Sequence, residues 1–415
     1  MKRIFLVGFL IVQGLWLSGQ IVLTIEGQEF NDVITGVSDG ISIARSQPTT
    51  FTFRNNSVTA VNSSGYMLQA GDEEPGYFNN NLDGSKITGN RFIWNGTDET
   101  STTHALFTGY SVNVVIKYNY LINTPNGIQR KSNGMTDISG VIAYNIIKNP
   151  VVGIVVKGMN GIRIYNNTLY GDNNSNQSSR GLIDIQTNTD GEVNAASTGT
   201  KIFNNVFYTK PSTVNIKIFE TACLSEFESD YNVFWCESGG PVFEINNETM
   251  TFAQWQAMGY DLHSVVLNPD FMDFNDFVPR VRLDYGKDLG QDFLNGLATG
   301  AVLGKTDPLT TIQNGTWQAG ARIYGGLDKE VFIYPNPAYD FFYVIIPDSE
   351  ISYHIIRVHD INGRLVMVDS LNTGLNKIQI PGKLSTGLYN ISIEATDMSL
   401  IKKKLVILKL GGVNP

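Results

Sequence analysis

The sequence predicts an all-β protein: a right-handed parallel β-helix followed by a small immunoglobulin-like β-sandwich. Three observations lead to this prediction. A pattern of β-branched residues, an aromatic residue, Asn and a second apolar run recurs four times between Val112 and Thr209. No segment in this region has the apolar periodicity of a helix. From about residue 331 the repeat gives way to short strands separated by turn signals.

The recurring motif is Asn-centred, and its copies are VVIKYNYLIN (114–123), GVIAYNIIKN (140–149), GIRIYNNTLY (161–170) and GTKIFNNVFY (199–208). The Asn that follows the aromatic residue falls at Asn119, Asn145, Asn166 and Asn204, with weaker copies at Asn56, Asn90 and Asn232. Repeats of this length are typical of solenoids, in which each repeat buries its apolar face by stacking on its neighbours. Asn tolerates a corner conformation, and stacked Asn amides bond one another between coils, so we expect a structural role for it.

A second family of strands lies between these motifs. Its members are NGIQRKS (126–132), VGIVVKG (152–158), RGLIDIQ (180–186) and VNIKIFE (214–220). Each coil therefore carries at least two short strands and no helical pattern. Parallel crossover connections are right-handed, which gives the predicted hand of the solenoid.

The N-terminus predicts export. Lys2 and Arg3 precede an apolar run from Ile4 to Leu17 and then small residues, so we expect a signal peptide over residues 1–20. The β-helix is expected over 21–326, with loops such as 72–81, 172–180 and 187–198 walling a groove. Only 17% of residues are charged and the net charge is −9, which argues against nucleic acid as a partner. Any acidic ligand requires a local basic patch.

Two cysteines, Cys223 and Cys236, are the only ones in the chain. After export they are able to form one disulfide, since they lie 13 residues apart on what should be neighbouring coils. Two buried thiols are an equally good interpretation. A metal site made from two Cys is disfavoured.

The segment FAQWQAMGYDLHSVVLNPDF (252–271) predicts how the solenoid closes. Its Trp255, Asp261, His263 and Ser264, followed by N-P-D-F, resemble the closing segment of secreted β-helix proteins of the pectate-lyase-like superfamily. The resemblance covers roughly residues 30–325. It implies the architecture and says much less about the chemistry.

The C-terminal part begins near Gly325-Gly326 and is predicted to be a separate domain over 331–410. Its pieces are VFIYPNPAYDFFYVII (331–346), VHDINGRLV (358–366), GLNKIQIPGKLSTGLYNISI (374–393) and KKKLVIL (402–408). Asn362-Gly363 is a hairpin turn signal. The order of these motifs resembles the type A C-terminal sorting domain of the type IX secretion system. That resemblance implies interaction with the secretion machinery and delivery across both membranes to the cell surface or the medium.

The best candidate site comes from aligning the second strand family. Gly127 on Gly153 places Ile128 over Ile154 and Lys131 over Lys157. If the isoleucines face the core, alternation sends the lysines outward, with Asp184 and Gln186 on the same face and His104 at the edge of the preceding coil. We take Lys131, Lys157 and Asp184 as candidate catalytic residues. The candidate substrate-binding residues are His104, Gln129, Arg130 and Gln186.

Two ammonium groups on adjacent strands repel each other, so the pair needs an acidic partner, an acidic ligand or the loss of one proton. Such a face resembles the site of uronate lyases. That resemblance implies that one cation neutralises the substrate carboxylate while a basic side chain removes the C5 proton. Lys131-Ser132 is similar to a motif of the alginate and chondroitin lyase group, but the next coil lacks that group's Arg-His-Gly.

Two functions of different classes follow. One is an extracellular enzyme that acts on acidic polysaccharide by β-elimination, as a uronate lyase does. The other is a non-catalytic glycan-binding or adhesion β-helix. The cofactor stays unknown: calcium suits lyase chemistry, yet no clear cluster of acidic ligands stands out, and we assign no metal ligand. We expect a monomer.

Overall fold

The structure is a computed structural model of the whole chain, and parts of it are described here. The described residues are 16–17, 20–33, 41–43, 49–61, 65–71, 83–96, 103–137, 139–172, 180–190, 193–210, 213–304, 307–313, 315–324, 331–334, 336–346, 353–372, 374–396 and 398–408. Of the predicted signal peptide, only Trp16, Leu17 and Gln20 are among them. The predicted boundary at Gly325-Gly326, the whole loop at 72–81 and most of the loop at 172–180 lie outside them.

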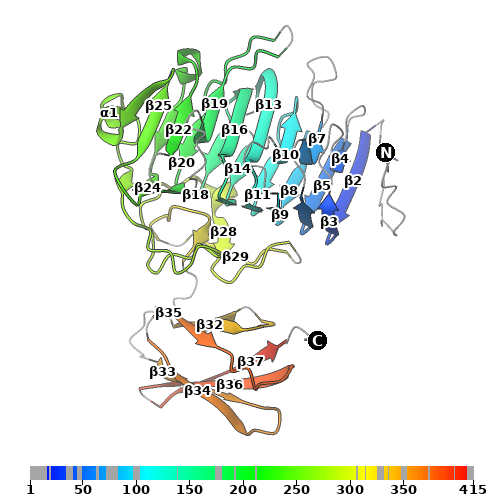
Figure 1. Cartoon of the computed structure of the whole chain (residues 1–415), viewed down its shortest axis with the longest axis vertical. Coiled ribbons are helices and arrows are strands. Elements are labelled where there is room, and N and C mark those ends of the chain that lie inside the picture. The colour runs from blue at the N-terminus through cyan, green and yellow to red at the C-terminus, as the bar shows by residue number, and fades with distance from the viewer. Residues whose placement is uncertain are drawn as a thin grey trace.

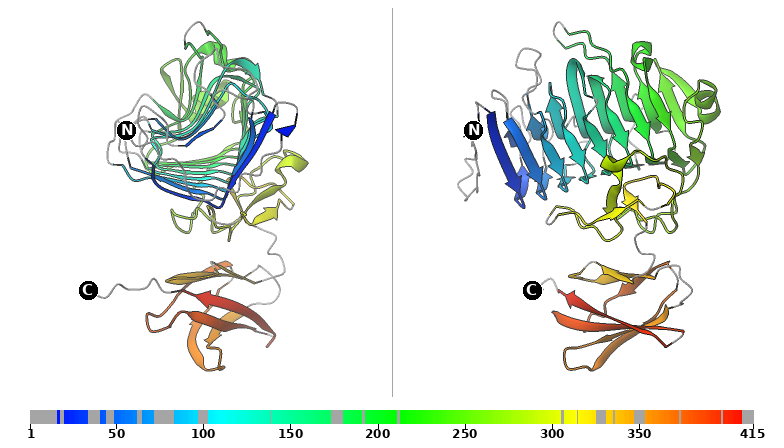
Figure 2. Two further views of the ribbon diagram at one scale, coloured as in Figure 1. Left: turned by 90° about the vertical axis from the view of Figure 1, so that its right-hand side faces the viewer. Right: turned by 180° about the vertical axis from the view of Figure 1, so that it is seen from behind.

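Three long sheets wind around a common interior, and each coil contributes one strand to every sheet (Figures 1 and 2). Sheet A contains β1 (Trp16–Leu17), β2 (Gln20–Glu26), β5 (Thr49–Arg54), β8 (Lys86–Thr88), β11 (Val115–Lys117), β14 (Val141–Ala143), β17 (Arg163–Tyr165), β20 (Lys201–Phe203) and β23 (Glu228–Asp230). Sheet B contains β3 (Glu29–Val33), β6 (Ser57–Ala60), β9 (Arg91–Trp94), β12 (Tyr120–Ile122), β15 (Ile146–Lys148), β18 (Thr168–Gly171), β21 (Val206–Thr209), β24 (Val233–Cys236) and β27 (Val265–Val266). Sheet C contains β4 (Ile41–Ile43), β7 (Tyr66–Ala70), β10 (His104–Gly109), β13 (Asn126–Thr136), β16 (Val152–Asn160), β19 (Gly181–Gln186), β22 (Val214–Ile218), β25 (Val242–Ile245) and β26 (Glu248–Thr251).

Neighbouring strands in these sheets pair in parallel between coils, and the antiparallel pairs among the described strands lie at the two ends. β1 pairs antiparallel with β2 at the first coil, and β25 with β26 at the last. The prediction of a parallel β-helix is therefore confirmed. Each coil has three strands where the sequence predicted at least two, because every Asn-centred motif divides into a sheet A strand and a sheet B strand.

The division within the motif has a local cause. The residue directly after the sheet A strand of each motif adopts a left-handed conformation, with φ 61° at Tyr118, 55° at Tyr144, 51° at Asn166 and 58° at Asn204. This conformation turns the chain sharply, so one extended segment becomes two strands that meet at a corner. Where the motif has two Asn residues, the first of them occupies the left-handed position.

The residue after this corner is an Asn in each coil, and the side chains of these Asn residues form a buried ladder of amides. The ladder runs through Asn56, Asn90, Asn119, Asn145, Asn167, Asn205 and Asn232. From Asn90 onward, each side-chain oxygen accepts from both the backbone N–H and the side-chain N–H of the Asn in the preceding coil. For the Asn145 oxygen and the two nitrogens of Asn119 these distances are 2.9 and 3.0 Å. The sequence alignment on Asn166 and Asn204 was therefore wrong by one residue. Asn therefore has both expected roles, the left-handed corner and the amide ladder, but at two consecutive positions.

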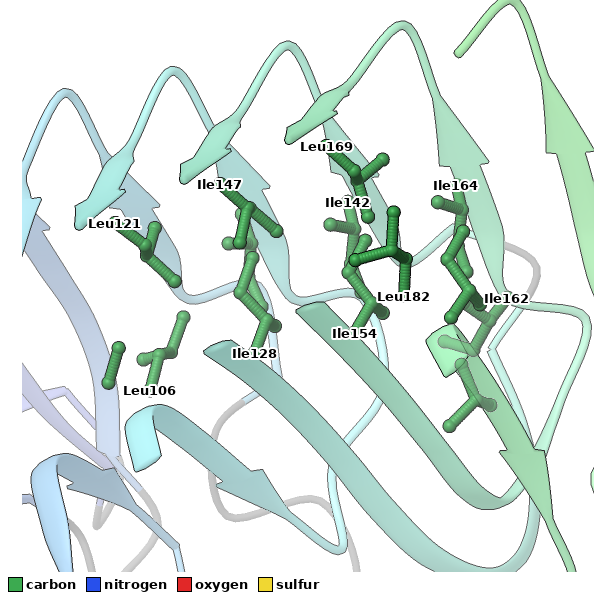
Figure 3. Packing of buried hydrophobic residues seen from close by; sticks show 14 of the residues in the cluster. Leu106, Leu121, Ile128, Ile142, Ile147, Ile154, Ile162, Ile164, Leu169 and Leu182 are labelled. Atoms are coloured by element: carbon green, nitrogen blue, oxygen red, sulfur yellow. The ribbon is translucent and has the colours of Figure 1, made fainter. Parts of the chain in front are cut away.

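The core fills the interior with aliphatic rows that continue from coil to coil. Leu121, Ile147 and Leu169 form one row, and Leu106, Ile128 and Ile154 form another (Figure 3). Identical positions stack because parallel strands in register place equivalent side chains about 4.8 Å apart. This stacking fixes which side chains of sheet C point outward.

A long C-terminal segment of the β-helix folds back over the outer faces of sheets A and B. We call residues 271–323 the strap; it includes η2 (Gln291–Phe293), β28 (Asn295–Ala298), β29 (Thr310–Ile312) and β30 (Arg322–Ile323). Its apolar residues cover outward aromatic side chains: the ring centroid of Phe293 lies 4.9 Å from that of Tyr165, and the centroid of Phe274 lies 4.9 Å from that of Tyr170. The strap therefore covers parts of sheets A and B.

The last coil closes on the motif recognised in the sequence. α1 (Phe252–Ala257) begins at a capping box made by Thr251 and Gln254, and η1 (Thr221–Leu224) lies one coil earlier. Trp255 is fully buried and donates to Asp261 at 2.7 Å. Asp261 also accepts from Asn232, so it ends the amide ladder.

The C-terminal domain has two antiparallel sheets around its own core. One contains β31 (Phe332–Tyr334), β32 (Phe341–Ile346) and β35 (Gly374–Gln379); the other contains β34 (Leu365–Ser370), β33 (Tyr353–His359), β36 (Gly387–Ala395) and β37 (Leu400–Ile407). This agrees with the predicted small sandwich after the β-helix. Among the described residues, no helix has the length and apolar character that crossing a membrane requires.

Candidate functional site

The two candidate lysines lie side by side on the outward face of sheet C. Lys131 on β13 is the direct partner of Lys157 on β16, and Gln186 on β19 follows in the same row. Glycine occupies both Gly127 and Gly153, which lie on adjacent strands, because the two backbones approach each other closely at this point. A Cβ added to Gly127 would lie 2.2 Å from the carbonyl oxygen of Gly153.

The acidic partner of the lysine pair is Asp190, which the sequence did not single out. Its carboxylate oxygens lie 2.5 Å from Lys131 Nζ and 2.9 Å from Lys157 Nζ. Burial alone would raise the pKa of the Asp190 carboxyl, but the hydrogen bonds and charges of both lysines outweigh this effect and lower it. One carboxylate thus bridges two ammonium groups that would otherwise repel each other.

Asp190 reaches the lysines because the loop from Thr187 to Thr198 folds over the end of sheet C. Asn188 and Ala195 exchange backbone hydrogen bonds of 2.8 and 3.0 Å, and the Asn188 side chain donates to the Ser132 carbonyl at 2.6 Å. Gly158 leaves space for the loop, since a Cβ there would lie 2.6 Å from the Asn188 Cβ. The loop is therefore packed against β13 and β16.

Asp184, the third candidate catalytic residue, lies in a different outward row. Its neighbours across the sheet are Val155 and Lys217, and its carboxylate accepts from Arg180 at 2.5 Å and from the Gly181 N–H at 2.8 Å. Lys217 in turn pairs with Glu244. Asp184 is fully buried, and burial raises the pKa of its carboxyl to about 6, against the lowering effect of Arg180.

We predict that Asp184 makes the stability of the β-helix depend on pH. Because the folded-state pKa is raised from 3.8 to about 6, its contribution is fully present below pH 3.8 and is lost as pH rises through 6. Over this window the loss is ~3 kcal/mol, at 1.36 kcal/mol per pH unit. Urea unfolding of wild type and Asp184→Asn between pH 3.5 and 7 should show the variant gaining about this much relative to wild type. Parallel pH profiles would contradict the prediction.

Gln129 and Arg130, two candidate substrate-binding residues, point to opposite sides of β13. Gln129 is half-buried on the outward face, beside Val155. Arg130 alternates with it and lies in the inward row of Val156, with only 1% of its surface exposed. Its guanidinium donates to Asp137, to Thr108 at 2.8 Å and to the Ser111 carbonyl at 2.8 Å. The structure thus gives Arg130 internal partners at the corner between sheets C and A.

His104, the remaining candidate, lies far along the strand from the lysine pair. It pairs with Asn126, whereas Gly109 pairs with Lys131, so five residues, or ~16 Å of strand, separate the two rows. The His104 ring packs at 5.0 Å from the ring of Tyr66, which also packs at 4.8 Å from Phe107. The structure does not bring His104 to the lysines; it places it in an aromatic group at the start of β7 and β10.

A hollow of about 710 Å³ opens at the corner where sheet C meets sheet A. We call it the corner hollow; its lining includes Thr136, Asn160, Arg163, Tyr165, Thr198, Lys201, Glu226 and Glu228. Sequence reasoning missed it. A signal was present, because Arg163 and Lys201 occupy the same position in two successive copies of the Asn-centred motif.

The structure holds both cysteines as free buried thiols. Among the described residues, no group of three or more His, Cys, Asp or Glu side chains is placed to hold a metal ion.

Comparison with known families bears on the C-terminal domain. Residues 332–408 match the model of the secretion system C-terminal sorting domain. No curated protein matches the chain.

The fold and this match define the class: a parallel β-helix protein with a C-terminal sorting domain of the type IX secretion system. Such a domain marks proteins for export to the cell surface or the extracellular space, and it implies interaction with the type IX secretion machinery.

Proposed function

We propose that the β-helix binds acidic polysaccharide outside the cell, on the outward face of sheet C, without cleaving it. The observation that carries this proposal is the Lys131–Asp190–Lys157 group, in which two register-paired cations share one carboxylate. Each chain carries the whole face, so we propose that the monomer is the binding unit.

Lys157 is the member of the group that a ligand reaches. Its side chain is 21% exposed, compared with 6% for Lys131, and the bridging Asp190 is 39% exposed. An ammonium carries three N–H donors, and the bond to Asp190 uses one of those on Lys157. A uronate carboxylate or a sulfate ester beside Asp190 would accept from the others.

The rest of the face suits a sugar chain. Gln129 and Gln186 present half-buried amides beside the lysine row, and the half-buried rings of Tyr66 and His104 lie at the start of β7 and β10. These residues span β7 to β19, which are five successive strands, or ~19 Å across the sheet. Aromatic rings cover the apolar faces of sugars, while amides bond their hydroxyls, as in other ligand sites with few polar groups.

Binding is favoured over β-elimination by the partners of the candidate catalytic residues. Elimination needs one cation for the substrate carboxylate and a second group that accepts the C5 proton. Both lysines already donate to Asp190, and Asp184 is enclosed by Arg180 and the Gly181 N–H. All three candidate catalytic residues are therefore engaged by partners within the protein, and none of the three is free to accept the proton.

We predict that Lys157→Met weakens binding of an acidic polysaccharide by ~1–3 kcal/mol, the usual range for a hydrogen bond to a charged group. Asp190 keeps Lys131 as its partner, so the fold should persist. Calorimetry with polygalacturonate, alginate and chondroitin sulfate measures the affinity, and the same mixtures are followed for the ultraviolet absorbance of unsaturated uronate ends.

The matched control is Lys148→Met, which removes a half-buried lysine of sheet B that donates to Asn275 at 3.0 Å. Equal affinity of wild type and Lys157→Met for every polymer would refute binding at this face. The appearance of unsaturated ends, abolished in Lys157→Met or Lys131→Met, would show that the protein is a lyase and that the non-catalytic assignment is wrong.

A further inference from the structure

The corner hollow is a second concave site, and it is built from different residues than the sheet C face. Its floor is Tyr165, whose ring is buried against Phe203 and Phe293 at 5.8 and 4.9 Å. One wall is fixed by Asn160, which accepts from the Thr198 N–H at 3.2 Å and donates to the Gly134 carbonyl at 2.9 Å. The hollow is therefore bounded by hydrogen-bonded segments.

Two cations stand together in this hollow. Arg163 and Lys201 are direct partners on β17 and β20, so their side chains leave the sheet in the same row. Lys201 also bonds Glu228, the next residue of that row, at 2.8 Å. The row thus reads cation, cation, carboxylate across three adjacent strands.

Arg163 is held in place without a carboxylate. Its Nε and Nη2 donate to the carbonyls of Gly140 and Ser139 at 3.3 and 2.9 Å, and its guanidinium lies 5.2 Å from the centre of the Phe293 ring. Among the described residues, no carboxylate forms an ion pair with Arg163. Carbonyl and ring contacts orient the guanidinium but do not neutralise it, so a fixed positive charge faces the hollow.

The remaining lining groups suit hydroxyl-rich ligands. Glu226 and Glu228 are exposed carboxylates that accept hydrogen bonds, and the hydroxyls of Thr136 and Thr198 both donate and accept. The volume of about 710 Å³ lies within the range of small-molecule sites. A guanidinium beside an ammonium selects a carboxylate, and the other groups select the hydroxyls attached to the same molecule.

We infer that the corner hollow is a second saccharide site, which binds a short uronic-acid oligosaccharide with its carboxylate on Arg163 and Lys201. This inference does not depend on the sheet C face, because the two sites share no residue. The hollow would take a chain end or a short oligosaccharide, whereas the sheet C face would bind a longer stretch of polymer.

The test is calorimetry of the full-length protein with trigalacturonate and with the neutral trisaccharide maltotriose. Arg163→Met should weaken trigalacturonate binding by roughly 10- to 100-fold, the range for losing a charge-assisted contact. The matched control is Arg91→Met, which removes another arginine that lies over an aromatic ring, 5.4 Å from the centre of Tyr120 on sheet B. Lys157→Met serves as the sheet C variant: it removes any binding at that face and should keep the trigalacturonate binding that depends on Arg163.

Each other outcome overturns a stated part of the inference. If maltotriose binds as tightly as trigalacturonate, the hollow does not select the carboxylate. If Arg163→Met binds like Arg91→Met, the ligand does not occupy the hollow. If Lys157→Met loses trigalacturonate as well, the oligosaccharide sits on the sheet C face, and only the proposed polymer site survives. Both sites are supported if Lys157→Met loses the polymer and Arg163→Met, but not Lys157→Met, loses trigalacturonate.

Discussion

Replacing Asp261 with Ala should destabilise the β-helix by ~3–5 kcal/mol, because it leaves several buried donors without an acceptor. The carboxylate is fully buried and accepts four hydrogen bonds, from Asn232 at 2.8 Å, Ser264 at 2.6 Å, Ser229 at 2.7 Å and Trp255 at 2.7 Å. These donors come from the end of the amide ladder and from the closing helix, so one side chain joins the last coil to its cap. Urea unfolding followed by far-ultraviolet circular dichroism measures the loss.

Two comparisons sharpen this prediction. Asp261→Asn keeps a side-chain oxygen and tolerates the left-handed backbone of this position, φ 51°, so it should lose less than the Ala variant. Asp284→Ala removes an exposed carboxylate paired with Arg282, and exposed pairs contribute ~0–1 kcal/mol. If Asp261→Ala unfolds at the same urea concentration as Asp284→Ala, the carboxylate does not hold the end of the ladder.

Replacing Arg130 with Met should also cost ~3–5 kcal/mol, because it leaves the Asp137 carboxylate buried without its counter-ion. Both side chains of this pair are almost completely buried, and Asp137 also accepts from the Asn113 N–H at 2.6 Å. The pair therefore joins β13 to the turn that leads into sheet A. Stability by urea unfolding and polysaccharide affinity by calorimetry are both measured.

The double variant Arg130→Met/Asp137→Asn is the decisive comparison. It removes the buried charge but keeps an acceptor for Asn113, so it should recover most of the lost stability. A variant as unstable as Arg130→Met alone would mean that shape, not charge, explains the effect. A loss of affinity in Arg130→Met with unchanged stability would return Arg130 to the substrate-binding role predicted from the sequence.

The sequence was informative wherever one residue type repeats at equivalent places. The Asn-centred motif predicted a solenoid because buried amides and left-handed corners impose strong local demands. The one-residue error at Asn166 and Asn204 arose because Asn meets both demands, so a pair of Asn residues can be aligned in two ways. The register of Lys131 on Lys157 was readable because Gly127 and Gly153 allow close backbone approach only at matched positions.

Contacts between segments that are distant in the sequence could not be predicted from the repeat. Asp190 comes from a loop that no repeat describes, and only packing on Ser132 and Gly158 brings its carboxylate to the lysines. His104 lies on sheet C, as Lys131 does, but its row crosses the sheet five residues away from the lysine row. Separation along a strand depends on where each strand begins, and the longer connection between β9 and β10 hides that point for His104.

By itself the sequence determined that this chain is a parallel β-helix followed by a sorting domain, since alternation, corner residues and ordered motifs are local properties. Only the tertiary structure decided which charges are already paired, that Arg130 is buried, and that the strap covers the aromatic residues of sheets A and B. It alone formed the corner hollow, where Arg163 and Lys201 from two coils meet Glu226 and Glu228. The physical reason is that a repeat specifies its own backbone, whereas the partner of an outward side chain is set by segments that do not repeat.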